Sequence, residues 1–190
     1  MKTLTEALES LLAALDQLEI PYEVGGSVAS SAHGIPRTTL DVDLVVDMAP
    51  DKIEQFVNEV REEFYADATQ MREAFTAGRA TNLIHLTGGW KFDLFPLLTD
   101  EYSRVEFARR AFREIQPNSG TSLECSLSSM EDTLLRKLQW FRARGEISER
   151  QWSDLLGMWN AGGPLADMEY LRRWAKRIGV GDLLEKLTGN

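Results

Sequence analysis

The sequence predicts an α+β protein in which a mixed β-sheet flanked by helices is followed by a C-terminal bundle of helices. Strand and helix patterns alternate over the first two thirds of the chain, and every pattern after residue 128 is helical. The 190 residues are enough for one good core with a helical annex. We therefore expect one domain over residues 1–128, with the helices of residues 129–190 packed on it.

The first helix is predicted over residues 4–18, where leucines recur at helical spacing. Thr3 and Glu6 form a capping box at its start, because the side chain of each can bond to the backbone N–H of the other. Pro21 ends this segment, and a short strand follows over residues 22–24.

A glycine-rich turn over residues 25–27 leads from that strand into a short helix, which Gly34 closes. The next strand is predicted over residues 40–46. Successive side chains of a strand point to opposite faces, so Asp41 and Asp43 share one face of this strand.

The remaining elements of the first domain follow from the same patterns. An amphipathic helix follows Pro50, and its predicted core face consists of Ile53, Phe56, Val57, Val60 and Phe64. Residues 67–78 are predicted to form a short helix or a loop, and residues 82–94 a hairpin. A helix followed by a strand is predicted over residues 101–116, and a last strand over residues 122–127. A solvated basic face is predicted for Arg104, Arg109, Arg110 and Arg113.

The C-terminal region is predicted to hold helices over residues 130–143 and 148–160, and one or two more over 167–187. Ser129 with Asp132 forms a capping box at the start of the first of these helices. The tryptophans of this region fall at core spacing, which favours packing over base stacking.

Composition indicates a globular cytoplasmic protein. No apolar run approaches the length of a membrane span, and the single cysteine, Cys125, fits a reducing compartment. The net charge is −9, and residues 1–129 hold 11 Lys and Arg against 21 Asp and Glu. This acidic part argues against broad nonspecific binding of nucleic acid, but it leaves room for an RNA end in a local basic groove.

Carboxylates on the predicted strands form the pattern that points to chemistry. Asp41 and Asp43 follow a glycine-rich helix N-terminus, whose free N–H groups suit phosphate oxygens. Asp93 is a third carboxylate, on the second strand of the hairpin. Aspartates hold the divalent cations that accompany a triphosphate, so this arrangement suits nucleotidyl transfer. The alternatives are a solvated pair of carboxylates at a strand end and, for Asp93, a cap for the following loop.

These residues resemble a known signature. The resemblance rests on the string Gly25-Gly26, Ala29, His33-Gly34, Arg37, Thr39, Asp41 and Asp43. It is similar to the signature of the nucleotidyltransferase superfamily, with its DNA polymerase β-like fold, and to the branch of AbiEii and MenT-type toxins. The resemblance implies the nucleotidyltransferase fold, an NTP as substrate, and Mg²⁺ or Mn²⁺ held by Asp41, Asp43 and Asp93.

A second stretch resembles the same toxin branch. It contains Glu131-Asp132, Lys137, Arg150 and Asp154, but it lacks the lysine that sometimes precedes the last aspartate. Lys137 is predicted to meet the triphosphate as a point charge, the alternative being a solvated helix lysine. Asp154 either orients Lys137 or Arg150, or forms a routine ion pair between helices.

The predicted nucleotide site also includes residues of the glycine turn and of the following loop. Gly26 and Ser27 are expected to bind the β- and γ-phosphates, and Thr39 to shape the loop or touch phosphate. Arg37 either neutralises charge on the leaving pyrophosphate or ties the loop to the strand.

The toxin resemblance implies addition of nucleotides to an RNA, such as a tRNA 3′ end, and a cognate antitoxin protein as partner. The alternatives are a transferase acting on an aminoglycoside-type small molecule or on a protein, and a non-catalytic nucleotide-binding module. An acidic protein is compatible with a cationic aminoglycoside. The sequence leaves the base of the NTP open, and also whether the protein is a monomer or a dimer.

Overall fold

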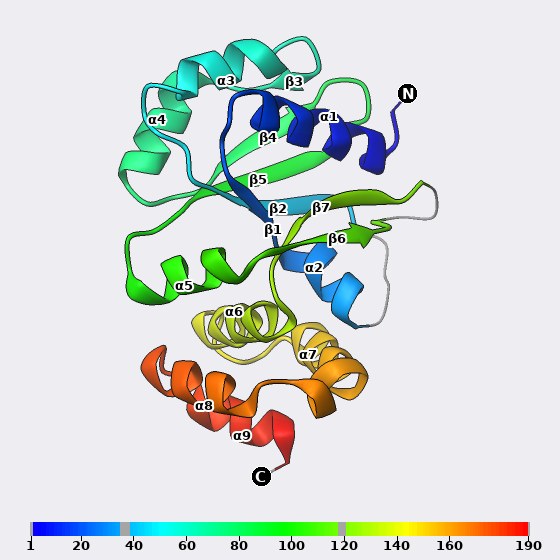
Figure 1. Ribbon diagram of the computed structural model, residues 1–190, viewed down its shortest axis with the longest axis vertical. Helices are drawn as coiled ribbons and strands as arrows, with labels where there is room; N and C mark the ends of the chain where they lie inside the picture. The colour runs from blue at the N-terminus through cyan, green and yellow to red at the C-terminus, as the bar shows by residue number, and fades with distance from the viewer. Residues whose placement is uncertain (1, 35–38, 118–120, 190) are drawn as a thin grey trace.

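Figure 1 shows a computed structural model of the protein, which describes residues 2–34, 39–117 and 121–189. Within these residues seven strands form one sheet, in the order β3-β4-β5-β2-β1-β7-β6. The strands are β1 (Tyr22–Val24), β2 (Asp41–Val46), β3 (Phe64–Tyr65), β4 (Thr81–His85), β5 (Lys91–Pro96), β6 (Ala111–Ile115) and β7 (Leu123–Leu127). The helices are α1 (Leu4–Gln17), α2 (Gly26–His33), α3 (Ile53–Val60), α4 (Ala68–Thr76), α5 (Glu101–Arg109), α6 (Met130–Ala143), α7 (Glu149–Gly162), α8 (Met168–Arg177) and α9 (Gly181–Thr188), with a short 3₁₀ turn at Gly163–Leu165.

The sheet is mixed, as predicted. Strand β2 runs parallel to β5 and antiparallel to β1, and β1 runs parallel to β7. Helices α1, α3 and α4 lie over one face of the sheet, while α2 and the helical region from α5 onward lie on the other side (Figure 1). This arrangement confirms the predicted α+β class with its flanking helices.

The core under α1 and α3 contains the strand residues that point away from the aspartates. Val42 and Leu44 of β2 and Phe92 and Leu94 of β5 are fully buried there. The predicted capping box starts α1, because the backbone N–H of Thr3 donates to Oε2 of Glu6 at 2.7 Å and that of Glu6 to Oγ1 of Thr3 at 3.2 Å. The apolar side of β2 and β5 therefore anchors the strands, and leaves their other side for polar residues.

Phe64 is a core residue, as predicted, but its predicted place on a helix was wrong. Phe64 is not on helix α3, which ends at Val60, but on the two-residue strand β3, where it pairs with His85 of β4. A buried aromatic residue four positions after Val60 fits a helical stripe as well as it fits a strand, so periodicity alone did not separate the two. The segment predicted as helix or loop forms α4, and Asp67 accepts a hydrogen bond from the N–H of Gln70 at its start.

A second hydrophobic cluster joins the C-terminal helices. It contains Leu134, Leu135 and Leu138 of α6, and it includes Tyr102 of α5 from the first predicted domain. The boundary at residue 128 stays a prediction, since α5 packs with the helices that follow that boundary. Among the residues described here, no helix is long and apolar enough to cross a membrane.

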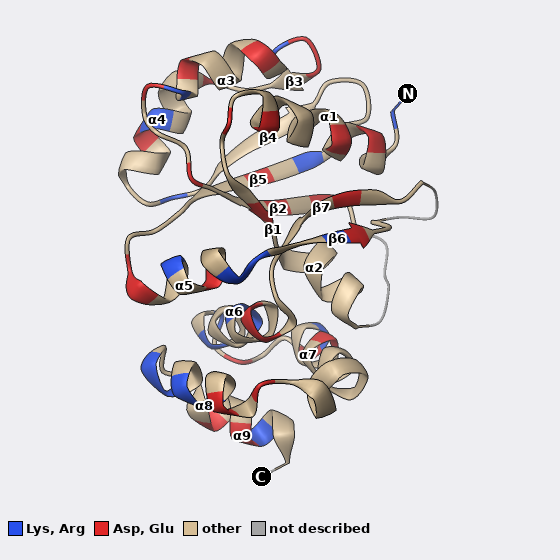
Figure 2. Cartoon of the chain, viewed as in Figure 1, with Lys and Arg blue, Asp and Glu red and all other residues tan. Residues whose placement is uncertain are grey.

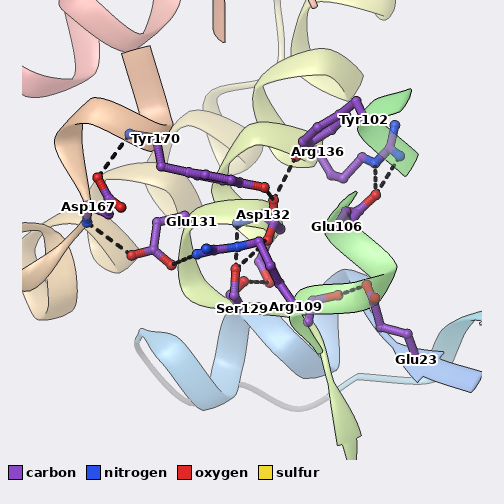
Figure 3. Close-up of polar contacts among 12 residues, drawn as sticks. Glu23, Tyr102, Glu106, Arg109, Ser129, Glu131, Asp132, Arg136, Asp167 and Tyr170 are labelled. Atoms are coloured by element: carbon purple, nitrogen blue, oxygen red, sulfur yellow. Dashed lines mark hydrogen bonds and ion pairs between the residues drawn. The ribbon is translucent and has the colours of Figure 1, made fainter. Parts of the chain in front are cut away.

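Buried polar side chains connect the sheet to α5, α6 and α8 (Figure 3). Glu23 of β1 is 1% exposed and accepts a hydrogen bond from Oγ of Ser128, just before α6. Arg136 of α6 donates from Nε to Oε2 of Glu106 on α5 at 2.7 Å. Burial, followed by the charge of Glu106, raises the pKa of Glu23 to about 7.

Asp132 is the centre of this polar network. It is fully buried and accepts hydrogen bonds from the hydroxyl of Tyr170 at 2.5 Å and from Nε of Arg109 at 3.0 Å. Glu131 accepts from Nη2 of Arg109 at 3.3 Å and from the backbone N–H of Asp167 at 3.1 Å. The prediction of a solvated face was therefore wrong for Arg109, which binds two carboxylates of α6.

Glu23 gives the network a pH dependence. Its folded pKa lies above the ordinary value of 4.5, so the unfolded chain releases this proton first, and stability falls as the pH rises from about 4.5 to about 7. We expect Glu23→Gln to raise the free energy of unfolding by about 1–3 kcal/mol at pH 8 and to have little effect below pH 4.5. Thermal unfolding against pH measures this difference, with the exposed Glu9→Gln as control. If the difference in melting temperature between Glu23→Gln and wild type did not grow as the pH rises over that range, the role of Glu23 would be contradicted.

Candidate active site

The three predicted aspartates lie on one face of two neighbouring strands. In the parallel pairing of β2 with β5, Asp43 is opposite Asp93 and Asp41 is opposite Lys91. The acidic positions of both strands can be followed in Figure 2. The register thus brings the carboxylate positions together, while their roles as metal ligands stay a prediction.

Asp43 lies directly against the glycine turn. The backbone N–H of Gly25 donates to the carbonyl oxygen of Asp43 at 2.9 Å. Gly26 has φ of +55°, and a Cβ added to it would lie 1.8 Å from Oδ2 of Asp43. Burial, followed by the charges of Asp93 and Asp41, raises the pKa of Asp43 to about 6. A buried carboxylate among like charges favours a bound cation.

The start of α2 lies next to the same carboxylates. No side chain caps this helix N-terminus, which begins at Gly26. The hydroxyls of Ser27 and Thr39 are 2.8 Å apart, and Thr39 donates to Oδ1 of Asp41 at 2.9 Å. Thr39 therefore shapes the link between the helix and β2. Arg37, also predicted for this site, lies outside the described residues.

Two neighbours of Asp93 were not assigned from the sequence. Lys91 donates from Nζ to Oδ2 of Asp93 at 2.5 Å, and Asn82 of the adjacent β4 donates to Oδ1. The hydrogen bond to Asp93 raises the pKa of Lys91. In the described part of the chain, no three acidic, His or Cys side chains are arranged to bind a metal ion together.

The donor set nevertheless has the chemistry that Mg²⁺ or Mn²⁺ prefers. Carboxylate oxygens are the usual ligands of these hard cations. Asp43 is held in the space that the missing side chain of Gly26 leaves, beside the charges of Asp41 and Asp93. A bound cation would relieve the repulsion among these charges, and Asp93 would exchange its bond to Lys91 for that cation.

Lys137 and Asp154 join α6 and α7 at this site. Nζ of Lys137 lies 3.2 Å from Oδ2 of Asp154, so the structure pairs Asp154 with Lys137. The charge of Lys137 also lowers the pKa of Asp43, partly opposing the carboxylates. The side chain of Lys137 is only 16% exposed, so Lys137 is not a solvated helix lysine. Glu131 and Asp132, by contrast, serve the buried network with Arg109.

Gly26→Ala tests the contact between the turn and Asp43. We expect this substitution to displace the Asp43 carboxylate and to cost about 1–2 kcal/mol in backbone strain, because φ is positive and the new Cβ clashes. Gly89→Ala is the matched control, since Gly89 has φ of +66° and nothing within 4 Å of an added Cβ. Thermal unfolding should show loss of stability in both variants, larger in Gly26→Ala because only its Cβ clashes, and NTP binding should be lost in Gly26→Ala alone. Equal NTP binding by the two would contradict the role of this contact.

The fold is similar, over nearly its whole length, to solved structures of nucleotidyltransferases. The solution structure of the antibiotic-resistance factor ANT(2″)-Ia matches 98% of this chain and 97% of that one, with a TM-score of 0.56 and 16% identity. Its crystal structure with adenylyl-2″-tobramycin matches 93% of this chain and 98% of that one, with a TM-score of 0.56 and 18% identity. An antigenic nucleotidyltransferase-like protein from Paracoccidioides brasiliensis matches 96% of this chain and 91% of that one, with a TM-score of 0.55 and 18% identity.

The chain therefore has the nucleotidyltransferase fold, as its sequence predicts. The chain matches no protein-family model and no curated protein sequence. The similarity includes the C-terminal helices, because the aligned structures cover almost all of this chain.

Proposed function

We propose that the protein is a metal-dependent nucleotidyltransferase, which moves an NMP from an NTP to an acceptor hydroxyl and releases pyrophosphate. The register of β2 and β5 carries this proposal, because it puts Asp43 opposite Asp93 beside the uncapped start of α2. Bound Mg²⁺ or Mn²⁺, held by Asp41, Asp43 and Asp93, would supply positive charge against the phosphate oxygens.

The reaction divides among residues of four elements. The oxygen of the acceptor hydroxyl forms a bond to the α-phosphorus, the bond from that phosphorus to the bridging β-oxygen breaks, and pyrophosphate leaves with the electron pair. The N–H groups of Gly26 and Ser27 would bind the β- and γ-phosphates. Lys137, oriented by Asp154, would neutralise the charge that develops on the leaving group. Asp93 would accept the proton of the hydroxyl.

For the acceptor we propose an RNA 3′ end, such as that of a tRNA. The resemblance of residues 25–43 and of Lys137 to the toxin nucleotidyltransferases supports this acceptor, and with it a role as the toxin of a type IV-like toxin–antitoxin system. In that role the protein has a cognate antitoxin protein as partner.

A second candidate acceptor is a small molecule of the aminoglycoside type. It is favoured by the similarity to ANT(2″)-Ia, which has been solved with adenylyl-2″-tobramycin. Transfer to a protein and nucleotide binding without turnover are the other outcomes that the test below separates.

Incubation with labelled NTPs tests the proposal. Each α-labelled NTP is supplied with Mg²⁺ to the wild-type protein together with total tRNA, an aminoglycoside panel, or lysate protein. We expect label on tRNA and none with Asp41→Asn. Label on an aminoglycoside or on protein would identify the other acceptors. Label on no acceptor, with no NTP-induced shift of the melting temperature, would refute the proposed function.

A further inference from the structure

A pair of aromatic side chains lies beside the candidate site. Phe95 is two residues after Asp93 on β5, so both side chains are on the same face of the sheet. Trp140 of α6 packs against Phe95, with ring centroids 6.5 Å apart and an interplanar angle of 69°. Trp140 is 49% exposed, so much of its indole remains open to solvent.

Trp140 differs from the other tryptophans of the chain. Trp90, Trp152, Trp159 and Trp174 all belong to, or pack against, one of the two hydrophobic clusters, whereas Trp140 belongs to neither. Trp140 packs against Phe95, as predicted for the tryptophans of the C-terminal region, but about half of its surface stays exposed. An indole that is 49% exposed gains little from burial, and this favours a binding role for Trp140.

Cationic side chains flank Trp140 on the same helix side. Cζ of Arg144 lies 5.6 Å from the centroid of the Trp140 ring. Lys137 precedes Trp140 by about one helical turn, and its positive charge lowers the pKa of Asp43. Positions 137, 140 and 144 are three and four residues apart, so they line one side of α6.

The strand order fixes which side of the reaction this pair serves. The order is β5-β2-β1, and the glycine turn follows β1. In the proposed reaction the leaving phosphates lie at that turn and the attacked phosphorus at β2, so an in-line acceptor would approach from the side of β5. Phe95 is on β5, so Phe95 and Trp140 lie on the acceptor side.

We propose that Phe95, Trp140 and Arg144, together called the aromatic platform, bind the last nucleotide of an RNA acceptor. This inference rests on the proposed function and names the chemistry of its acceptor site. The nucleobase stacks on Trp140, which Phe95 holds in place, and Arg144 contacts a neighbouring phosphate. Stacking on an aromatic ring tolerates any base, and an adjacent arginine adds attraction to the backbone.

Equilibrium binding tests the platform without turnover. A short single-stranded RNA with a free 3′ hydroxyl and a 5′ fluorophore is titrated with protein, and its fluorescence anisotropy is measured in the absence of NTP. We expect Trp140→Ala to raise Kd by roughly 5- to 150-fold and Trp140→Phe by only about threefold, because the latter keeps a ring. Arg144→Ala should lower the salt dependence of Kd. Arg172→Ala, an exposed arginine of α8, is the control and should leave Kd unchanged.

The outcomes separate the platform from the proposed function. Melting temperatures show that each variant is folded, and Trp140→Phe provides a second variant if Trp140→Ala is not. An unchanged Kd in folded Trp140→Ala, or no RNA binding by the wild type, would overturn the platform. Loss of RNA binding in Trp140→Ala supports the platform even where the wild type transfers no label and shows no NTP-induced shift of the melting temperature, a result that would refute the proposed function alone.

Discussion

Replacing Asp43 with asparagine is expected to lower the rate of nucleotidyl transfer by at least about 10²–10³-fold. Asp43 has Asp41 two residues before it on β2 and Asp93 opposite it on β5. Its Oδ2 occupies the space beside Gly26. An amide of the same shape would keep the packing against Gly26 but would lose the negative charge that a bound cation requires. Activity should therefore fall although the local structure is retained.

The same substitution is expected to make the protein more stable. The pKa of Asp43 is raised to about 6 in the folded state, chiefly by burial and then by Asp93 and Asp41. As the pH rises, this carboxylate ionises in the unfolded chain before it ionises in the folded protein. The free energy of unfolding therefore falls between about pH 4 and about pH 6, and this loss stays constant at higher pH. Asp43→Asn removes a penalty of about 1–3 kcal/mol at pH 7.5.

Two measurements on one variant check both expectations. Initial rates with saturating NTP and Mg²⁺ report transfer, and urea unfolding without metal reports stability. Asp47→Asn, an exposed residue just after β2, is the control and should change neither quantity. An Asp43→Asn protein that is less stable than wild type would show that the carboxylate has a structural partner instead of a functional one.

The helix and strand plan followed from local patterns wherever those patterns were complete. Helix α6 starts and ends as predicted, because Ser129 accepts from the N–H of Asp132 and apolar residues recur at helical spacing. The boundary of α3 was missed because the two-residue strand β3 is too short to show alternation. Short elements are fixed by their neighbours in space, here by the pairing of Phe64 with His85.

The candidate site, like the secondary structure, was predictable only where a local pattern determines it. Alternation along each strand put Asp41 and Asp43 on one face, but only the register places Asp93 opposite Asp43. Asn82 comes next to Asp93 through the antiparallel pairing of β4, which no local pattern encodes. The spacing of Trp140 fits a core position, but its side chain is 49% exposed and belongs to neither hydrophobic cluster, and only the fold brings it against Phe95.

Contacts distant in sequence were the hardest to predict. Arg109 and Asp132 are 23 residues apart and Glu23 and Ser128 are 105 apart. A charged residue in a polar run resembles a solvated one until the fold buries its partner. The buried network between sheet and helices was therefore absent from the expectations, although its residues were all visible in the sequence.

Asp132→Ala is expected to lower the free energy of unfolding by about 3–5 kcal/mol. Asp132 is fully buried and accepts hydrogen bonds from Arg109, Tyr170 and Ser129, at 3.0, 2.5 and 2.6 Å. Tyr102 also donates to it, at 3.3 Å. Its removal leaves a partly buried guanidinium and two buried hydroxyls short of an acceptor, which costs far more than the intact network contributes. Small proteins are stable by only about 5–15 kcal/mol, so the variant should be close to unfolding at 37 °C.

Urea unfolding at pH 7 measures this loss against a matched exposed carboxylate. Asp182 of α9 pairs with Arg142 at 2.6 Å but is 68% exposed, so Asp182→Ala should change the free energy of unfolding far less than Asp132→Ala. Hydrogen exchange should further show faster opening of α5, α6 and α8 in Asp132→Ala, while β2 and β5 keep their protection. Equal stability of the two variants would mean that water enters and replaces the carboxylate. Because the network joins the helix that holds Lys137 to the sheet that holds the aspartates, its loss should weaken NTP binding before it unfolds the strands.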